Sequence, residues 1–330
     1  MLAALWCVPA AAQCYVYVPT HKSNSVAVID TSTDQVIAMI PVQIQPLAVA
    51  ITPNGSFAYV TNSGWIFGSN SVSVIDTASN TVVATIGVGS FPVGVAITPN
   101  GAFAYVANFN SNSISVINTT TNTVTAGVAV GAGPWGLAIT PNGAFAYVTN
   151  LNSNDVWVIN TATNAVVAKV LVGNGPVAIA ITPNGAFAYV TNESSDNVSV
   201  ISTATNTVVA TVPVVSGSYS SGPYAVAVTP NGAFAYVANA AASTVSVIDT
   251  ATNKVMATVR VGTTPHGVAI TPDGQSAYVG NEYSSTVSVI DTRTNTVVDT
   301  VNGVAVAPEG VAIKHPQFQP VPCHYVTPVQ

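Results

Sequence analysis

Short runs of apolar residues, each broken after a few positions by polar ones, recur along almost the whole chain, a pattern typical of β-strands rather than helices. One unit of this pattern occupies residues 134–173 and contains four such runs, GLAIT, AFAYVTN, DVWVIN and AVVAKVLV. The runs are rich in Val, Ile and other residues that favour strands. The pattern therefore predicts four β-strands in each unit.

The connections between these runs carry turn-forming residues. In TPNG (residues 140–143), Pro presets the first corner, and Gly accepts the left-handed conformation that a tight hairpin needs. In NTATN (residues 160–164), short polar side chains can bond their own backbone, and Asn tolerates a positive φ. Two hairpins joined in sequence predict a four-stranded antiparallel meander.

The unit occurs seven times, with a spacing of roughly 42 residues that two insertions, residues 63–69 and 216–222, lengthen. The tyrosine of the second strand marks the copies: Tyr17, Tyr59, Tyr105, Tyr147, Tyr189, Tyr236 and Tyr278. Repeats of this length, made only of strands, are typical of β-propeller blades.

The two ends of the repeat array indicate how the units are arranged. The chain enters at a second strand, residues 15–18, and finishes with a first strand, residues 310–314. Pairing these ends leaves no exposed sheet edge, whereas an open β-solenoid would instead need polar capping repeats. We therefore predict an all-β fold: a seven-bladed β-propeller of four-stranded antiparallel blades over residues 13–314, closed by a composite blade of three N-terminal strands and one C-terminal strand. Residues 315–330 form a C-terminal tail.

The tetrapeptide Tyr-Val-Thr-Asn, at residues 59–62, 147–150 and 189–192, precedes strands of the VSVIDT type. This combination resembles the YVTN family of bacterial and archaeal β-propellers. The resemblance extends from Cys14 to Lys314 and is weakest at residues 17–20, which read YVPT. It implies a seven-bladed propeller in an extracytoplasmic, surface-layer-type protein, and it implies no particular activity.

Composition limits the partners that the chain can have. Only 5% of the residues are charged, the net charge is −6, and the six Lys and Arg residues are spread along the chain. Nucleic-acid binding needs a positive footprint, so we expect no nucleic-acid partner. No apolar run approaches the ~20 residues of a membrane helix, so we expect no transmembrane segment. A small polar ligand, a peptide or an envelope protein is the expected partner of a monomer.

The N-terminus suggests a cellular location. Residues 1–12, MLAALWCVPAAA, match the later part of a secretory signal peptide, and Ala10 and Ala12 complete a cleavage pattern before Gln13. The usual basic start is missing, so the signal is truncated or its start codon is misplaced; an ordinary apolar N-terminus is the alternative. We expect an extracytoplasmic protein, in the periplasm, on the cell surface or secreted.

Three cysteines are present. Cys7 would leave with the signal, whereas Cys14 and Cys323 lie just outside the repeats at opposite ends of the chain. An oxidising compartment permits a Cys14–Cys323 disulfide across the closure of the ring. Two unpaired cysteines are the equally weighted alternative.

Candidate chemistry gathers at two variable positions in each blade. In a propeller the first strand lines the central channel, and the loops that enter it and that leave the second strand share one face. The first set comprises Leu47, Val93, Trp135, Val177, Tyr224, His266 and Glu309, and the second comprises His21, Ser63, Phe109, Leu151, Glu193, Ala240 and Glu282. All three glutamates and two of the four histidines fall on these positions, so this face should hold the functional site.

The polar members of the two sets cluster on one side of the ring. The aromatic residues Trp135, Tyr224 and Phe109 are expected on the opposite side. Such a funnel suits a small polar ligand or a peptide. The candidate ligand-binding residues are His21, Lys22, Phe109, Trp135, Glu193, Tyr224, His266, Glu282 and Glu309.

Three interpretations of this face compete. The preferred one is a non-catalytic recognition surface, because fold alone confers no chemistry. The alternative is a lactonase- or lyase-like enzyme in which His266, Glu282 and Glu309 are the catalytic candidates, acting as acid and base or through a divalent metal ion. The third is a set of solvated loop residues. The chain lacks GxSxG, P-loop and HExxH motifs, and no cofactor other than that metal ion is expected.

Overall fold

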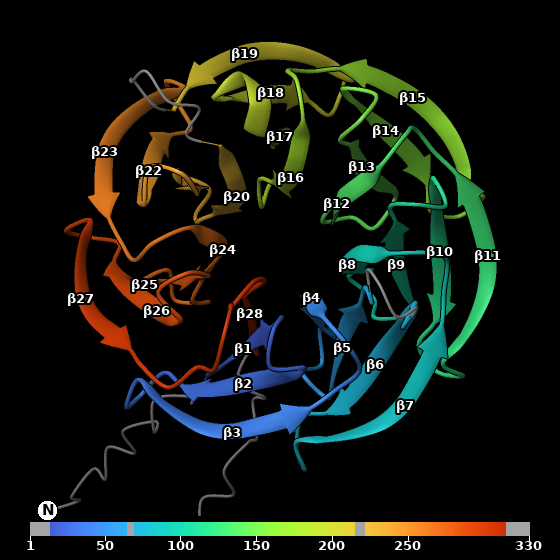
Figure 1. The fold of residues 1–330 in the computed structure, drawn as a ribbon. Helices are drawn as coiled ribbons and strands as arrows, with labels where there is room; N and C mark the ends of the chain where they lie inside the picture. The colour runs from blue at the N-terminus through green and yellow to red at the C-terminus, as the bar shows by residue number, and fades with distance from the viewer. Residues whose placement is uncertain (1–13, 65–68, 215–221, 315–330) are drawn as a thin grey trace, which may run out of the picture.

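The computed structural model describes residues 14–64, 69–214 and 222–314, and their strands form seven antiparallel four-stranded sheets arranged as blades around a central channel (Figure 1). In these residues the single helix is the three-residue 3-10 turn Glu193–Ser195. None of the described residues forms a helix long and apolar enough to cross a membrane. The predicted all-β, seven-bladed propeller is confirmed.

Each blade runs from an inner strand at the channel to an outer strand at the rim, and every blade but one uses four consecutive strands. The first three of these blades are β4 (Pro46–Ile51), β5 (Phe57–Asn62), β6 (Ser71–Asp76) and β7 (Thr81–Gly87); β8 (Pro92–Ile97), β9 (Phe103–Asn108), β10 (Ser113–Asn118) and β11 (Thr123–Ala129); and β12 (Pro134–Ile139), β13 (Phe145–Asn150), β14 (Asp155–Asn160) and β15 (Ala165–Leu171). The next three are β16 (Pro176–Ile181), β17 (Phe187–Asn192), β18 (Asn197–Ser202) and β19 (Thr207–Pro213); β20 (Pro223–Val228), β21 (Phe234–Asn239), β22 (Thr244–Asp249) and β23 (Lys254–Arg260); and β24 (Pro265–Ile270), β25 (Ser276–Asn281), β26 (Thr286–Asp291) and β27 (Thr296–Val301).

The seventh blade joins the two ends of the repeat array. Its strands are β28 (Ala312–Lys314), β1 (Tyr15–Thr20), β2 (Ser25–Asp30) and β3 (Gln35–Pro41). Strand β28 pairs antiparallel with β1, placing Tyr15 opposite Lys314 and Tyr17 opposite Ala312, and the red C-terminal strand lies beside the blue N-terminal ones in Figure 1. The predicted three-plus-one closure is therefore confirmed.

Several predictions from the sequence fall outside the described residues. These are the signal peptide at residues 1–12, the tail at residues 315–330, and Cys323. Cys14 lies one residue before β1, where its carbonyl oxygen accepts a hydrogen bond from the Thr31 backbone N–H at 3.2 Å. The Cys14–Cys323 disulfide stays a prediction.

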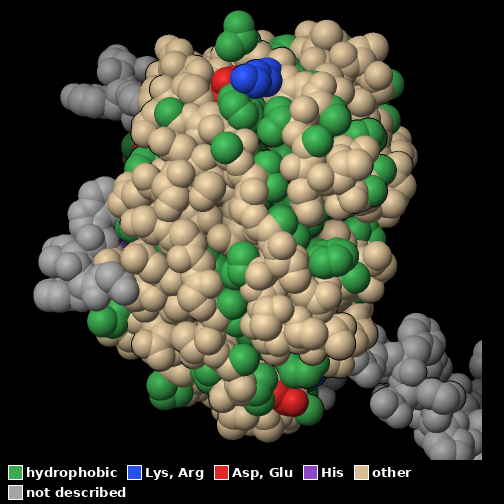
Figure 2. Space-filling view, turned by 90° about the vertical axis from the view of Figure 1, so that its right-hand side faces the viewer, with side chains coloured by type: hydrophobic (Ala, Val, Ile, Leu, Met, Phe, Trp, Pro, Cys, Tyr) green, Lys and Arg blue, Asp and Glu red, His purple; other side chains and the backbone are tan. Residues whose placement is uncertain are grey.

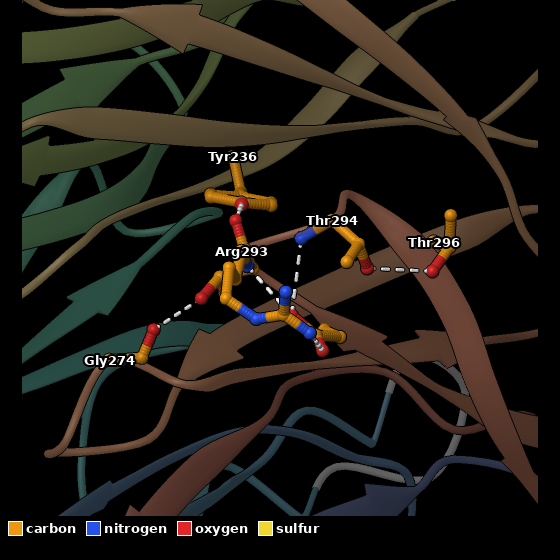
Figure 3. A network of polar contacts seen from close by, with 7 residues as sticks. Tyr236, Gly274, Arg293, Thr294 and Thr296 are labelled. Atoms are coloured by element: carbon orange, nitrogen blue, oxygen red, sulfur yellow. Dashed lines mark hydrogen bonds and ion pairs between the residues drawn. The ribbon is translucent and has the colours of Figure 1, made fainter.

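The tyrosine of each second strand fastens its blade to the next one. Tyr59, buried between two blades, donates its hydroxyl hydrogen to Asn122 Oδ1 at 2.7 Å, in the turn between β10 and β11. The equivalent tyrosine Tyr236 donates to Asn295 Oδ1 at 2.6 Å. Figure 3 shows Tyr236 above the turn that contains Arg293 and Thr294. The acceptors are asparagines in the left-handed region in six blades: Asn80, Asn122, Asn164, Asn206, Asn253 and Asn295.

The threonine and asparagine of the tetrapeptide also have structural roles. Thr61 Oγ1 donates to the carbonyl oxygen of Val93 in the next blade at 2.7 Å. Asn62 Nδ2 donates to Ser73 Oγ of its own blade at 3.0 Å. The recurring motif is thus a set of fasteners within and between blades, and it brings no reactive group to the channel.

Apolar clusters fill the space between neighbouring blades. In one of them Tyr105 and Val116 of one blade pack with Ala146, Val148 and Ile159 of the next, all five at most 1% exposed. The outer strands β3, β15 and β23 alternate exposed and partly buried positions, as edge strands facing water do. Figure 2 shows one side of the rim, where hydrophobic and uncharged side chains predominate.

Candidate functional site

The inner strands surround a channel cavity of about 240 Å³. Six inner strands begin with a Pro, and the residue after this Pro, like Glu309 after Pro308 in the seventh blade, lines the channel. All seven residues predicted for this position line the cavity: Leu47, Val93, Trp135, Val177, Tyr224, His266 and Glu309. We call the part of the channel that these seven residues line the channel mouth.

The polar candidates meet at one side of the channel mouth. His266 Nδ1 lies 2.9 Å from Glu309 Oε2 and 3.8 Å from Glu282 Oε2. The side chains of His266, Glu309 and Glu282 are 16%, 11% and 12% exposed, so these three groups interact largely out of water. A carboxylate can only accept a hydrogen bond, so the His266 Nδ1–H donates to Glu309 and leaves Nε2 as the acceptor nitrogen. Three segments distant in sequence thus form one cluster.

Backbone contacts hold Glu309 in place. Its N–H donates to the carbonyl oxygen of Pro19 in β1 at 3.0 Å, and the next residue, Gly310, donates to the carbonyl oxygen of Leu47, also at 3.0 Å. Thr20 and Pro308 form an isolated bridge between the same segments. Glu309 therefore owes its position to the segment that closes the ring.

Lys22 supplies a cation at the rim of the site. Its Nζ lies 3.6 Å from Glu282 Oε1 and 5.4 Å from the centre of the Tyr283 ring, and the side chain is 54% exposed. The ammonium group partly offsets the charge of Glu282, although water weakens an ion pair this exposed.

The aromatic candidates form an arc that begins at His266. The Tyr224 ring stacks on the His266 imidazole, with centroids 4.1 Å apart and planes 12° apart. Trp135 then meets Tyr224 edge to face at 6.2 Å, Phe109 meets Trp135 at 5.5 Å, and Phe91 meets Phe109 at 5.7 Å. The expectation that Tyr224 lies across the ring from the polar cluster was wrong, because neighbouring blades bring the two rings into contact.

His21 and the arc enclose a second cavity of about 260 Å³ at the channel mouth. Its lining residues are His21, Gln45, Leu47, Phe91, Trp135, Tyr224 and Glu309. Burial lowers the pKa of His21, although Glu309 and Glu282 oppose this shift, so His21 is neutral at neutral pH. Its Nδ1 is buried without a hydrogen-bond partner among the described residues.

Phe91 and Gln45 belong to this cavity but were not among the candidates from sequence. Both precede the Pro of an inner strand and have a positive φ, 56° and 57°. Three blades place Gly at this position, Gly133, Gly175 and Gly222. The sequence signal that would have identified Phe91 and Gln45 is a bulky residue at a position where three other blades have glycine.

The last candidate, Glu193, lies in the 3-10 turn that follows β17 and is held by a bond from its N–H to the carbonyl oxygen of Gly175 at 2.9 Å. Burial first, and then the carboxylates of Glu309, Glu193 and Glu282, raise the pKa of Tyr224 well above its usual range. Tyr224 is therefore a neutral phenol bordered by three negative groups.

The cluster could also hold a metal ion. One ligand atom each from His266, Glu282 and Glu309 lies within 4.8 Å of the others. Imidazole nitrogen with carboxylate oxygens is a donor set that zinc and related divalent ions accept.

Comparison with known proteins identifies a family. The model of the family described as "Lactonase, 7-bladed beta-propeller" matches residues 11–127 and 131–315. No curated protein matches the chain. The match to a family of lactonases corrects the preferred interpretation from the sequence, a non-catalytic recognition surface rather than an enzyme, and favours the lactonase-like alternative. That preference rested on the argument that fold alone confers no chemistry, and a site assembled from separate blades leaves no local motif.

Solved structures share the fold. Hydrazine synthase from Kuenenia stuttgartiensis is 27% identical, with a TM-score of 0.75 over 84% of this chain and 92% of that chain. A protein from Lactobacillus plantarum is 18% identical, with a TM-score of 0.79 over 91% and 99%. A protein from Bacteroides uniformis, named as a candidate 6-phosphogluconolactonase, is 16% identical, with a TM-score of 0.77 over 92% and 99%. The last two likenesses concern the fold alone.

Proposed function

Because the chain belongs to the lactonase family of seven-bladed β-propellers, we propose that it is a lactonase whose reaction takes place at the channel mouth. The observation that carries this proposal is the 2.9 Å contact between His266 Nδ1 and Glu309 Oε2 beside a cavity. A histidine oriented by a carboxylate is a general base suited to activating water.

The proposed reaction is hydrolytic ring opening. Glu309 holds His266 through Nδ1, and Nε2 takes a proton from water as the water oxygen attacks the lactone carbonyl carbon. The ring C–O bond then breaks, and the leaving alkoxide receives the proton from Nε2, giving a hydroxy acid. Glu282, 3.8 Å from the same imidazole, stabilises its transient positive charge.

A divalent ion at the same cluster is a second mechanism, supported by the 4.8 Å grouping of ligand atoms. An ion held by His266, Glu282 and Glu309 would polarise the lactone carbonyl. A chelator distinguishes the two mechanisms: it abolishes turnover if the ion acts, and leaves turnover unchanged if the His266–Glu309 pair acts alone.

The first test is substitution of the base. His266→Ala should lower kcat for a simple lactone by about 10²- to 10⁴-fold, the usual contribution of general-base catalysis. The thermal midpoint should change little, since no strand pairing depends on the imidazole. Ring opening releases acid, so a pH-stat measures it directly.

Glu309→Gln should weaken turnover in the same assay by removing the charge that orients His266. Asp299→Asn, a change of the same type on an exposed position of the outer strand β27, should leave turnover unchanged. Full turnover by a His266→Ala, Glu282→Ala and Glu309→Ala triple variant would show that the reaction lies elsewhere.

We also propose that the chain is a YVTN-type propeller that acts outside the cytoplasm as a monomer, with no nucleic-acid partner. The tetrapeptide at residues 59–62, 147–150 and 189–192 and the apolar residues 1–12 support this proposal. Fractionation of cells that express the chain, followed by detection in the periplasm or medium, tests the location.

A further inference from the structure

We infer that the channel mouth selects uncharged lactones that carry an apolar substituent, and that it excludes phosphorylated lactones. This inference rests on the proposed lactonase activity and names the substrate class of that same site. It follows from where the cations, the carboxylates and the aromatic rings lie.

The cations of the chain lie almost entirely away from the site. Phosphate recognition uses arginine or lysine side chains, arginine most often as a bidentate partner. Five of the six cations belong to outer strands, to the β26–β27 turn or to β28, namely Lys169, Lys254, Arg260, Arg293 and Lys314. The sixth, Lys22, is at the mouth but already faces Glu282 at 3.6 Å. No unopposed cation remains there for a phosphate group.

The carboxylates add repulsion to this lack of cations. Glu282 and Glu309 lie at the mouth, 3.8 and 2.9 Å from His266 Nδ1, and together with Glu193 they raise the pKa of Tyr224. Set against the single ammonium group of Lys22, they leave an excess of negative charge around the cavity. A phosphate dianion entering such a partly desolvated mouth meets a repulsive field.

The other wall of the cavity is apolar. Phe91, Trp135 and Leu47 line it, and the inner-strand side chains Val93 and Leu137 line the channel beneath. A lactone ring beside His266 would place a substituent against Trp135, and a longer chain would reach Phe91. Aromatic faces and edges bind alkyl and aryl groups through burial of apolar surface.

The backbone at Phe91 supports this role. An aromatic residue with a φ of 56° occupies a strained conformation where three other blades use glycine. The ring is only 5% exposed and meets Phe109 edge to face. The contact with Phe109 holds this aromatic ring in the lining of the cavity.

The experiment compares three δ-lactones as substrates of the wild-type protein: δ-valerolactone, a pentyl-substituted δ-lactone and 6-phosphoglucono-δ-lactone. Each buried methylene should raise kcat/KM about three- to fourfold, so the pentyl compound should exceed δ-valerolactone by at least about tenfold. The phosphorylated compound should fall at least about 100-fold below the pentyl one, because its charge opposes binding. Equal rates for the phosphorylated compound, or no preference for the pentyl one, would overturn the inference.

Variants test which residues cause the preference for the pentyl substituent. Trp135→Leu should reduce the ratio of the pentyl-lactone rate to the δ-valerolactone rate. Phe91→Leu should reduce the corresponding ratio for lactones with longer alkyl chains. Trp157→Leu is the matched control, because Trp157 lies in β14, away from the channel mouth. There the Nζ of Lys169 is 3.9 Å from the centre of the Trp157 ring. An unchanged ratio in Trp135→Leu contradicts the proposed wall.

A binding assay separates this inference from the proposed reaction. Calorimetry with a pentyl-substituted δ-lactam, which resists hydrolysis, should show binding that Trp135→Leu weakens and inorganic phosphate does not displace. Lactam binding without hydrolysis of any lactone would contradict the lactonase and uphold the ligand preference. Hydrolysis of δ-valerolactone without lactam binding would uphold the lactonase and contradict the ligand preference.

Discussion

Glu309 depends on a glycine in the neighbouring blade. A Cβ added at Gly267 would lie 2.2 Å from the Glu309 carbonyl oxygen, a distance that no relaxed structure accepts. The inner strand β24 and the segment before β28 can approach this closely because Gly267 has no side chain. Gly267 thus sets the distance between His266 and Glu309.

Gly267→Ala should therefore lower turnover by about 10²-fold, because a shift of about 1 Å in a catalytic group costs that much. Gly136→Ala is the control, since its Cβ would meet the Val177 carbonyl oxygen at 2.3 Å, away from the polar cluster. Both variants should lose comparable stability in thermal unfolding. Equal turnover in the two would show that the Gly267 contact does not position Glu309.

Phe91 and Tyr224 show what a sequence pattern leaves out. Periodicity located the inner strands and so most residues of the channel mouth, because every blade follows one template. The template does not give the direction of a side chain, so the stacking of Tyr224 on His266 was missed. It also does not flag residues whose role depends on a positive φ, as at Phe91.

The second strands hold the blades together by a repeated contact, and one copy can be removed cleanly. Tyr105 donates its hydroxyl hydrogen to Asn164 Oδ1 at 2.8 Å, with the Thr161 carbonyl oxygen at 3.3 Å. Tyr105→Phe deletes the donor and leaves two part-buried acceptors without it, which should cost about 1–2 kcal/mol of unfolding free energy. The same change at Tyr283, which is 69% exposed, should cost almost nothing.

Calorimetry of the two variants measures this difference, with an expected fall of about 2–4 °C in thermal midpoint per kcal/mol for the Tyr105 variant. Equal midpoints for the two variants would show that the inter-blade hydrogen bond contributes nothing net. The fold was predictable from the sequence because this contact and its flanking strands repeat seven times. The choice between recognition and catalysis was not, because His266, Glu282 and Glu309 occupy positions whose residues vary from blade to blade.

Closure of the ring uses a variant of the same contact. Tyr278 donates to Asp34 Oδ1 at 2.6 Å, where the other six blades use asparagine. Burial raises the pKa of Asp34, and the hydrogen bond from Tyr278 only partly offsets this. The folded protein therefore binds a proton on Asp34 that the unfolded chain has already lost, so this group lowers stability as pH rises through that interval.

Asp34→Asn should remove this dependence. At neutral pH the Asp34→Asn variant should be the more stable protein. Its thermal midpoint should rise by about 2–4 °C for each kcal/mol of unfolding free energy gained. The advantage should shrink as the pH falls through about 4 and vanish below it, where aspartate becomes protonated in both states. Thermal scans across this range test the sign, and a variant less stable at every pH would contradict it.

Glu309 comes from the segment that closes the ring, His21 and Lys22 from the other end of the repeat array in the same composite blade, and His266 from the neighbouring blade. A growing polypeptide cannot assemble this centre while earlier blades emerge, because its last carboxylate is translated after all the other blades. Under the proposed lactonase activity, partly synthesised or partly folded chains should therefore be inert. Hydrolysis would then report a completed ring, and its recovery during refolding would follow ring closure rather than the formation of individual blades.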